Sequence, residues 1–431
     1  MRNVKCVLIN PPYSMTRDYY EKGGIDVPLG VAYIASTLRE AGIDVAVIDM
    51  PIERMGWKDL EAEVERLHPN VVGITAITIS YPQALNAAQV VKSIDPEIPV
   101  ILGGPHVTFT PRETLGHEVV DFVVMHEGEY ALRQLIENDF RNLDKIGNVA
   151  FKKDGSIHIN QNYFIENLDD LPLPARDLFP MADYRALNDF TSVLTSRGCP
   201  FGCIFCVPCR MFETSYRTRA VDKVIQEIVH LKAAYHFNKV GFVDDIFTLK
   251  RRRVEQFCEA LEEIDVRWMC NSRVDTLDKE LCERMHEAGC TTLFFGAESG
   301  NTQVLDTLKK RIQPSQILNA VKWAKDAGIE VHLSFIIGTP GETRDMIMET
   351  LEFIDSLDVD RLTISPLTPY PGTSLGDLPE EWGIKIIQRT WNQYNMMLPL
   401  IETKELSIQE LTDIWLHIVK KYYVHEGEKN G

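Results

Sequence analysis

Long apolar runs and basic stretches are both missing from this sequence. Nowhere do roughly 18 apolar residues follow one another, so no membrane-spanning helix is expected. Lys and Arg number 45 against 63 Asp and Glu, a net charge of −18, and that charge repels nucleic-acid phosphates and anionic lipid heads. The longest basic run, residues 250–253, is read as the solvated first turn of a helix. We therefore expect no nucleic acid and no membrane among the partners.

Cysteine is sparse and unevenly placed. There are nine cysteines, an odd number, and four of them fall within residues 199–209. This clustering indicates metal binding and not a disulfide framework. The start of the chain shows no small-residue cleavage site, so we expect a cytoplasmic protein, in a reducing compartment that would protect a thiolate-ligated iron site.

Residues 4–140 alternate short apolar runs with amphipathic stretches. Strands are expected at residues 4–9, 45–48, 71–77, 100–103 and 122–125, and helices at residues 29–41, 60–67, 83–93 and 129–140. Five such βα units predict an α/β fold with a doubly wound, flavodoxin-like sheet. An Asp-Gly turn within residues 152–156 predicts a β-hairpin that ends a first domain, residues 1–165. Residues 166–190, with three prolines, are expected to be a linker.

A second alternating series begins at residue 191. Its strands are expected at residues 192–195, 240–243, 267–270, 292–295, 331–337 and 361–365, with helices centred near residues 226, 257, 283, 320 and 350. Six repeats are fewer than the eight that close a full barrel, so residues 191–374 predict a partial (β/α)6 barrel. The remainder, residues 375–431, is expected to be a small helical C-terminal region.

The strongest chemical signal is a C-x3-C-x2-C motif formed by Cys199, Cys203 and Cys206 directly after the first strand of this series. Three thiolates can bind three irons of a four-iron, four-sulfur (4Fe–4S) cluster and leave the fourth iron open, whereas structural zinc takes four closed ligands. The alternatives are a zinc knuckle, or an all-cysteine electron-transfer cluster with Cys209 as its fourth ligand. Otherwise Cys209 is a spectator thiol.

With the segments that follow it, the motif resembles the radical S-adenosylmethionine (SAM) superfamily over residues 191–373. The resemblance rests also on Gly-Ala-Glu-Ser-Gly at 296–300 and Gly-Thr-Pro-Gly-Glu-Thr at 338–343. It implies that the amino and carboxylate groups of SAM bind the open iron, and that an electron from the cluster cleaves SAM to a 5′-deoxyadenosyl radical. It also implies SAM contacts by Phe205, Arg273, Glu298, Ser299, Gly338 and Gly341; no catalytic side chain can be named.

Several of these positions have a simpler interpretation. Asp244 and Asp245 could be cofactor contacts or only a helix cap for the segment from residue 250. Arg273 could bind the SAM carboxylate or form a surface salt bridge. Glu298 is harder to explain without a ligand, because a carboxylate after an apolar strand would point into the barrel mouth and needs a cationic partner such as the SAM ammonium.

In the first domain, glycines, prolines and polar residues follow the expected strands. They lie at the edge where a doubly wound sheet binds ligands, and glycine there lets a large flat ligand approach the backbone. Taken with the second domain, residues 4–140 resemble the cobalamin-binding domain of class B radical SAM enzymes. The resemblance implies cobalamin contacts by Pro12, Leu29, Gly30, Thr75, Gly103, Gly104, His106, Glu127 and Gly128.

Two familiar motifs are absent from this domain. The Asp-x-His-x-x-Gly signature that supplies an imidazole to cobalt does not occur, so His106 is expected to line the corrin without ligating cobalt. A dinucleotide site would need Gly-x-Gly-x-x-Gly after the first strand, where residues 10–15 read NPPYSM. A vestigial domain that keeps the sheet and binds nothing is the remaining alternative.

The resemblance implies a cobalamin-dependent radical SAM methyltransferase that adds the methyl group of methylcobalamin to an unactivated carbon. We expect a peptide or protein side chain as acceptor, such as arginine or glutamine, by similarity to the enzymes that modify methyl-coenzyme M reductase. We expect ferredoxin or flavodoxin as electron donor. The alternatives are a non-methylating enzyme that cyclises or hydrates a small molecule, and a non-catalytic cobalamin-binding or electron-transfer protein.

Overall fold

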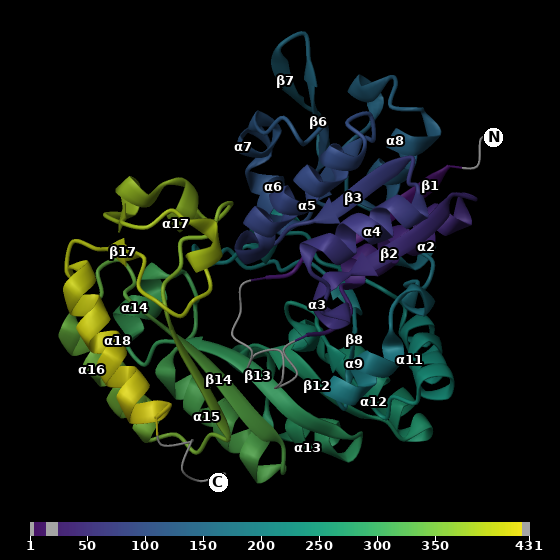
Figure 1. The fold of residues 1–431 in the computed structure, drawn as a ribbon. Coiled ribbons are helices and arrows are strands. Elements are labelled where there is room, and N and C mark those ends of the chain that lie inside the picture. The colour runs from purple at the N-terminus through teal and green to yellow at the C-terminus, as the bar shows by residue number, and fades with distance from the viewer. Residues whose placement is uncertain (1–3, 14–24, 425–431) are drawn as a thin grey trace. The chain divides into compact units, whose positions relative to one another are not determined.

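The computed structural model describes residues 4–13 and 25–424, and the chain divides into two compact units (Figure 1). Unit 1 comprises residues 1–194 and 217–237, and unit 2 comprises residues 195–216 and 238–431. Among the described residues, no helix is both long and apolar enough to cross a lipid bilayer.

Unit 1 is built on a seven-stranded sheet in the order β2-β1-β3-β4-β5-β6-β7. Its strands are β1 Lys5–Asn10, β2 Asp44–Asp49, β3 Val71–Thr75, β4 Val100–Gly103, β5 Phe122–Val124, β6 Val149–Lys153 and β7 Ser156–Ile159. β1 to β5 are parallel, and β6 and β7 form the antiparallel hairpin expected from the Asp-Gly turn. The order 2-1-3-4-5 of the parallel strands confirms the flavodoxin-like prediction.

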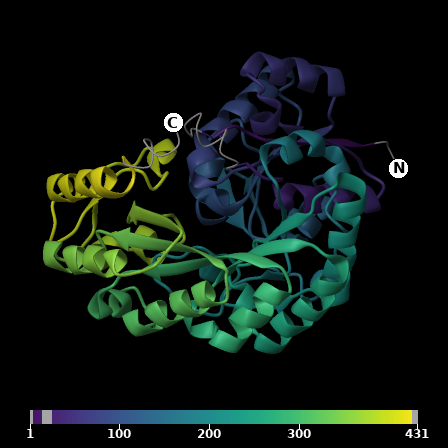
Figure 2. The ribbon, with the colours of Figure 1, turned by 90° about the horizontal axis from the view of Figure 1, so that it is seen from below.

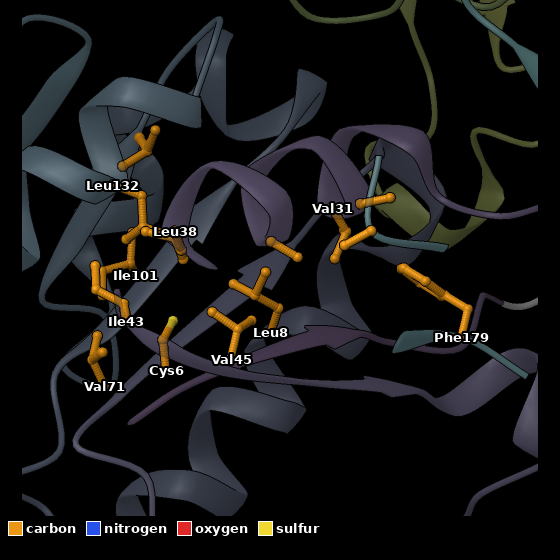
Figure 3. Packing of buried hydrophobic residues seen from close by; sticks show 14 of the residues in the cluster. Cys6, Leu8, Val31, Leu38, Ile43, Val45, Val71, Ile101, Leu132 and Phe179 are labelled. Carbon is orange, nitrogen blue, oxygen red and sulfur yellow. The ribbon is translucent and has the colours of Figure 1, made fainter. Parts of the chain in front are cut away.

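Helices cover this sheet because its parallel strands are apolar on both faces. They are α2 Leu29–Glu40, α3 Met50–Glu53, α4 Trp57–Leu67, α5 Tyr81–Ile94, α6 Pro105–Phe109, α7 Pro111–Gly116 and α8 Glu129–Glu137. Figure 3 shows the core beneath α2, where Cys6, Leu8 and Val45 from the strands point toward Val31 and Leu38. This packing fixes the ends of β1, β3, β4 and β5 at one edge of the sheet.

The residues expected to be a linker are ordered on unit 1. They contain α9 Met181–Leu187, whose Tyr184 hydroxyl donates a hydrogen bond to the buried Asp49 at the end of β2. β8 Thr191–Val193 and α11 Val221–Tyr235 complete the unit. A buried carboxylate on α11, Glu227, pairs with both Arg176 and Arg219 and so ties α11 to these segments.

Unit 2 contains five parallel strands in the order β15-β14-β13-β12-β11, and with β8 all six expected strands are present. They are β11 Lys239–Phe242, β12 Arg267–Ser272, β13 Cys290–Glu298, β14 Glu330–Ile337 and β15 Arg361–Pro366. The helices α12 Arg251–Ile264, α13 Lys279–Glu287, α14 Thr302–Thr307, α15 Pro314–Asp326 and α16 Arg344–Asp355 follow the strands in turn. They lie along one face of the sheet, as in a partial barrel (Figure 2).

The C-terminal region is less helical than the sequence suggests. It holds α17 Ser374–Asp377 and one long helix, α18 Ile408–Tyr422, which starts with a capping box between Ser407 and Glu410. Between them lie irregular chain and a short antiparallel pair, β16 Lys385–Ile386 with β17 Ile401–Glu402. In this small C-terminal region the helical part is therefore mainly α18, and the chain between α17 and α18 is largely irregular.

Candidate active site

The three motif cysteines lie on one loop of unit 2, between β9 Ser196–Arg197 and α10 Pro208–Met211. Cys199 and Cys203 are buried and Cys206 is half-buried. The loop can turn at Gly198 because this residue has φ +94°, and a Cβ there would overlap the carbonyl oxygen of Ser215. Sequence and backbone geometry therefore agree that only glycine fits before Cys199.

Burial raises the pKa of Cys199 to about 11 and also raises that of Cys203, although the positive charges of Lys310 and Arg273 act in the opposite direction on Cys203. A side-chain hydrogen bond between Cys206 and Cys209 raises the pKa of Cys206 and lowers that of Cys209 to about 7. The metal-free ligands are therefore thiols, and binding iron must displace their protons.

The donor set fits a cluster better than a single metal ion. Among residues 4–13 and 25–424, no three His, Cys, Asp or Glu side chains converge closely enough to hold one ion. A 4Fe–4S cluster does not require such convergence, because each thiolate binds a different iron. Three thiols on one loop, with a positive side chain nearby, fit that group, whereas a closed zinc site would need four convergent ligands.

Glu298 ends β13, where it forms a buried ion pair. Its carboxylate Oε1 lies 2.7 Å from the Lys310 Nζ, and both side chains are nearly inaccessible to solvent. The strand register shifts between Gly296 and Glu298, and Glu298 adopts φ +65°. Such a bulge re-aims a side chain at local cost. A Cβ at Gly296 would overlap the Glu298 carboxylate, which explains the glycine of this motif.

Sequence reasoning missed Lys310. In the sequence it belongs to the run Lys309-Lys310-Arg311, which looks like an ordinary solvated basic turn. The structure instead buries the Lys310 side chain against Glu298. Burial alone would lower the pKa of Lys310, but the charge of Glu298 and the hydrogen bond to it hold this pKa above its usual value. The residues on either side of Lys310 are both left-handed, Lys309 at φ +55° and Arg311 at φ +57°.

Arg273 and Ser299 both have protein partners. The guanidinium of Arg273 is buried, forms two hydrogen bonds with Asp275, donates a third to the Lys310 carbonyl and stacks on the Phe201 ring. The Ser299 hydroxyl is paired with Thr350 of α16 at 2.9 Å. Phe205 is half-buried on the cysteine loop. The SAM contacts expected of these residues stay predictions.

The loop after β14 encloses a buried carboxylate. The Glu342 Oε2 accepts hydrogen bonds from the amides of Gly338 (2.7 Å) and Thr339 (2.9 Å) and from the Thr339 hydroxyl. Its Oε1 is buried and has no hydrogen-bond partner among the described residues, and burial raises the pKa of Glu342 to about 7. Gly341, with φ +78°, faces open space. Glu342 stands in the quoted motif, but nothing in the sequence marks its burial.

Asp244 does not cap a helix. Its carboxylate is fully buried after β11 and accepts hydrogen bonds from the Thr195 amide at 2.7 Å and from the Ser196 hydroxyl. The helix α12 starts at Arg251, with Lys250 at its N-cap, so the capping interpretation is wrong. Asp244 instead fixes the backbone that leads into the cysteine loop. Burial raises the pKa of the neighbouring Asp245 to about 6.

Several glycines and uncharged residues lie at the ligand edge of unit 1. Gly30, in the first turn of α2, is exposed, and a Cβ added there would meet nothing within 4 Å. Gly104, with φ +104°, packs so closely on Ala76 that a side chain would collide with its backbone. Pro12, Leu29, Thr75 and Gly103 are half-buried at the same edge. This surface of small residues suits a large flat ligand such as a corrin.

His106 is buried in this edge. Its ring packs on Tyr81 with centroids 4.2 Å apart, and its Nδ1 lies 3.3 Å from the Thr78 hydroxyl. Burial lowers the pKa of His106 to about 3, so the imidazole is neutral at physiological pH. Glu127 is also buried, beside Gly128, and accepts hydrogen bonds from the Ile165 amide and from Arg217. His106 and Glu127 therefore support the ligand edge from buried positions.

Comparison with known proteins agrees with both sites. Residues 22–136 match the B12 binding domain, and residues 193–354 match the Radical SAM superfamily. An uncharacterised methyltransferase from Pyrococcus horikoshii is 34% identical over 433 residues, covering 98% of this chain and 92% of that protein. This chain belongs to the cobalamin-dependent radical SAM methyltransferase family.

Two further similarities extend the picture of this methyltransferase family. The anaerobic magnesium-protoporphyrin IX monomethyl ester cyclase of Rubrivivax gelatinosus is 27% identical, over 95% of this chain and 76% of the cyclase. The fold is also that of the radical SAM methyltransferase TsrM from Kitasatospora setae, solved with tryptophan and a SAM analogue, at a TM-score of 0.76 and 17% identity over 90% of this chain and 79% of TsrM.

Membership of this family confirms the cofactors expected from the sequence: a 4Fe–4S cluster, SAM and cobalamin. It confirms that the chain is an enzyme and excludes the non-catalytic alternative. The assignment of individual cofactor contacts stays a prediction, to be tested by the variants below.

Proposed function

We propose that this methyltransferase adds a methyl group to an unactivated carbon of a peptide or protein side chain. When bound, SAM, the cluster and cobalamin supply the radical and the methyl group. The protein's own share is to orient the reactants and to exclude water. Support for methyl transfer comes mainly from the 34% identical methyltransferase, which matches the chain over nearly its whole length.

The residues of unit 2 suit the charged end of SAM. Glu298 and Lys310 present a buried carboxylate and a buried ammonium 2.7 Å apart, a pair that a zwitterionic amino-acid group could match with opposite charges. The burial of both groups keeps water away from their charges and so strengthens such an interaction. In this proposal, Glu298 and Lys310 bind and orient SAM, and neither of them carries the methyl group.

Support for a peptide acceptor comes from the C-terminal region of unit 2. Its irregular segment exposes Met396, Met397 and Leu398, each at about half of its full surface, although large apolar side chains are usually covered. Flexible methionines adapt to varied apolar side chains of a partner. These residues could therefore hold an extended chain, with ferredoxin or flavodoxin proposed as the electron donor.

A free small molecule is the second candidate acceptor. The relative in Rubrivivax gelatinosus is named for a porphyrin ester, and TsrM was solved with tryptophan. The cyclase also supports a variant of this candidate in which no methyl group reaches the product.

Methyl-labelled SAM separates these candidates. The reconstituted protein is incubated anaerobically with labelled SAM, a reductant and extract of a host strain that lacks this gene. Label in a protein fraction, located on one peptide, supports the proposal. Label in a lipid or small metabolite overturns the peptide acceptor, and SAM cleavage with an unlabelled product overturns methyl transfer.

A further inference from the structure

The cysteine loop rests on a short segment that follows α14, residues 308–310, here called the cluster bed. The amides of Leu308, Lys309 and Lys310 bond back to α14, so their three consecutive carbonyls are free to face other groups. The Leu308 carbonyl accepts from the Ile204 amide at 3.2 Å, and the Lys309 carbonyl lies 3.8 Å from the Cys203 sulfur.

The third carbonyl of the cluster bed, that of Lys310, accepts a hydrogen bond of 2.9 Å from Arg273 Nη2. Asp275 holds the guanidinium edge through Nε (2.9 Å) and Nη2 (3.0 Å), which fixes its plane. The Phe201 ring lies against the face of this plane, with the guanidinium carbon 3.8 Å from its centroid. Arg273, only 4% exposed, therefore links the cluster bed to Phe201 on the cysteine loop.

Metal loading changes which of these contacts persist. The Cys203 thiol can approach the Lys309 carbonyl as a donor only while it carries a proton, and a thiolate that binds iron has none. After loading, the loop is held on the cluster bed by the Ile204 amide and by the stacking of Phe201 on Arg273. A cation over an aromatic ring is stabilising, and more so away from solvent.

We infer that Arg273 is a positioning residue for the 4Fe–4S cluster, which holds the cysteine loop on the cluster bed through its planar guanidinium. This differs from a direct contact with the SAM carboxylate, because Nε and Nη2 already have protein partners. The inference goes beyond the proposed function and does not depend on the methyl acceptor.

The test uses the full chain, reconstituted anaerobically, with two readouts that need no turnover. One is the electron paramagnetic resonance (EPR) spectrum of the reduced cluster without and with SAM, and the other is the rate at which a chelator removes iron. We compare Arg273→Ala, Arg273→Lys, Phe201→Leu and Phe201→Tyr. Arg251→Ala is the control, since Arg251 makes solvent-exposed ion pairs in the same unit.

Arg273→Ala, Arg273→Lys and Phe201→Leu are expected to alter the spectrum without SAM and to lose iron about 10-fold faster, as when a residue supporting metal ligands is removed. Phe201→Tyr and Arg251→Ala should match the wild type. The inference is overturned if Arg273→Ala keeps the wild-type spectrum without SAM and loses only the change caused by SAM, while Arg273→Lys shows that change. Phe201→Leu decides alone if Arg273→Ala fails to fold, and a wild-type result there also overturns the inference.

Discussion

The ligand edges of the two units are built in different ways. At the strand ends of unit 2, charged side chains are buried: Asp244, Arg273, Glu298, Lys310 and Glu342 all lie under 9% exposed. At the strand ends of unit 1, Gly30, Gly104 and the neutral His106 lie at the ligand edge, and the buried carboxylates of Asp49 and Glu127 are hydrogen-bonded within the same unit. A small, charged cofactor is recognised by buried charges, which interact strongly away from water. A large, flat cofactor instead needs a surface without protruding side chains, so that its ring can approach the backbone.

From this comparison we expect that losing a cysteine ligand in unit 2 has the largest effect on cluster content and SAM cleavage. Changing Cys199, Cys203 or Cys206 to Ala should leave a protein that cannot cleave SAM, because three protein thiolates are needed to hold the cluster. The measurement is iron and sulfide content together with formation of 5′-deoxyadenosine. Cys209→Ala, the matched control in α10 directly after the loop, should retain both. Loss of the cluster in Cys209→Ala with retention in Cys199→Ala would show that the ligands are assigned wrongly.

Removing one partner of the buried ion pair should have the next largest effect. Lys310→Met leaves the Glu298 carboxylate buried without its cation, which we expect to lower the free energy of unfolding of the metal-free protein by about 3–5 kcal/mol. Chemical denaturation measures this change. The double variant Lys310→Met, Glu298→Gln should recover part of the loss.

The control for that pair is Lys325→Met, which breaks the partly exposed pair with Asp360 in the same unit. It should change the free energy of unfolding by less than about 1 kcal/mol. Equal losses in the two lysine variants would contradict a special role for the buried pair.

The buried Glu342 carboxyl group predicts that the free energy of unfolding depends on pH. Its pKa rises from 4.5 to about 7 on folding, so between these values the native state binds more protons than the unfolded state. The free energy of unfolding therefore falls as pH rises from about 4.5 to 7, by up to about 3 kcal/mol. Glu342→Gln should flatten this decline in denaturation curves. Glu352→Gln, an exposed change on α16, should not, and identical slopes in wild type and Glu342→Gln would refute the explanation.

In unit 1 the same comparison predicts a smaller effect on cobalamin binding, which depends on the shape of the ligand edge and not on its charge. Gly30→Leu fills the open space at the start of α2, and we expect cobalamin to bind about 10-fold more weakly, a cost of about 1.4 kcal/mol, with little change in unfolding. Absorbance titration with cobalamin measures this. Gly116→Leu, also exposed and uncrowded, is the control. Unchanged cobalamin binding in Gly30→Leu would show that the corrin does not lie against α2.

Much of this arrangement follows from the sequence alone. Apolar runs predict all the parallel strands, since a strand buried on both faces needs consecutive apolar residues. The spacing of the cysteines predicts the cluster, and the position of Glu298 after such a run predicts a buried carboxylate that needs a cation. The six-residue helix α14 was not predicted, because it is too short to show helical periodicity.

Other features depend on backbone geometry that residue types do not specify. The buried Lys310 lies between Lys309 and Arg311, which are both left-handed, a conformation that neither residue prefers. The burial of Glu342 depends on two amides presented by the loop after β14. The stacking of Arg273 on Phe201 joins residues 72 positions apart, and no local pattern encodes that contact.

The most direct test of the central claim is SAM cleavage by the reconstituted protein under anaerobic conditions. The protein is supplied with SAM, cobalamin and a reductant, and 5′-deoxyadenosine is measured by mass spectrometry. We predict that the wild type forms it and that Cys206→Ala does not, while both proteins bind similar amounts of cobalamin. Failure of the cluster-loaded wild type to form 5′-deoxyadenosine, or formation by Cys206→Ala at the wild-type rate, would contradict the assignment.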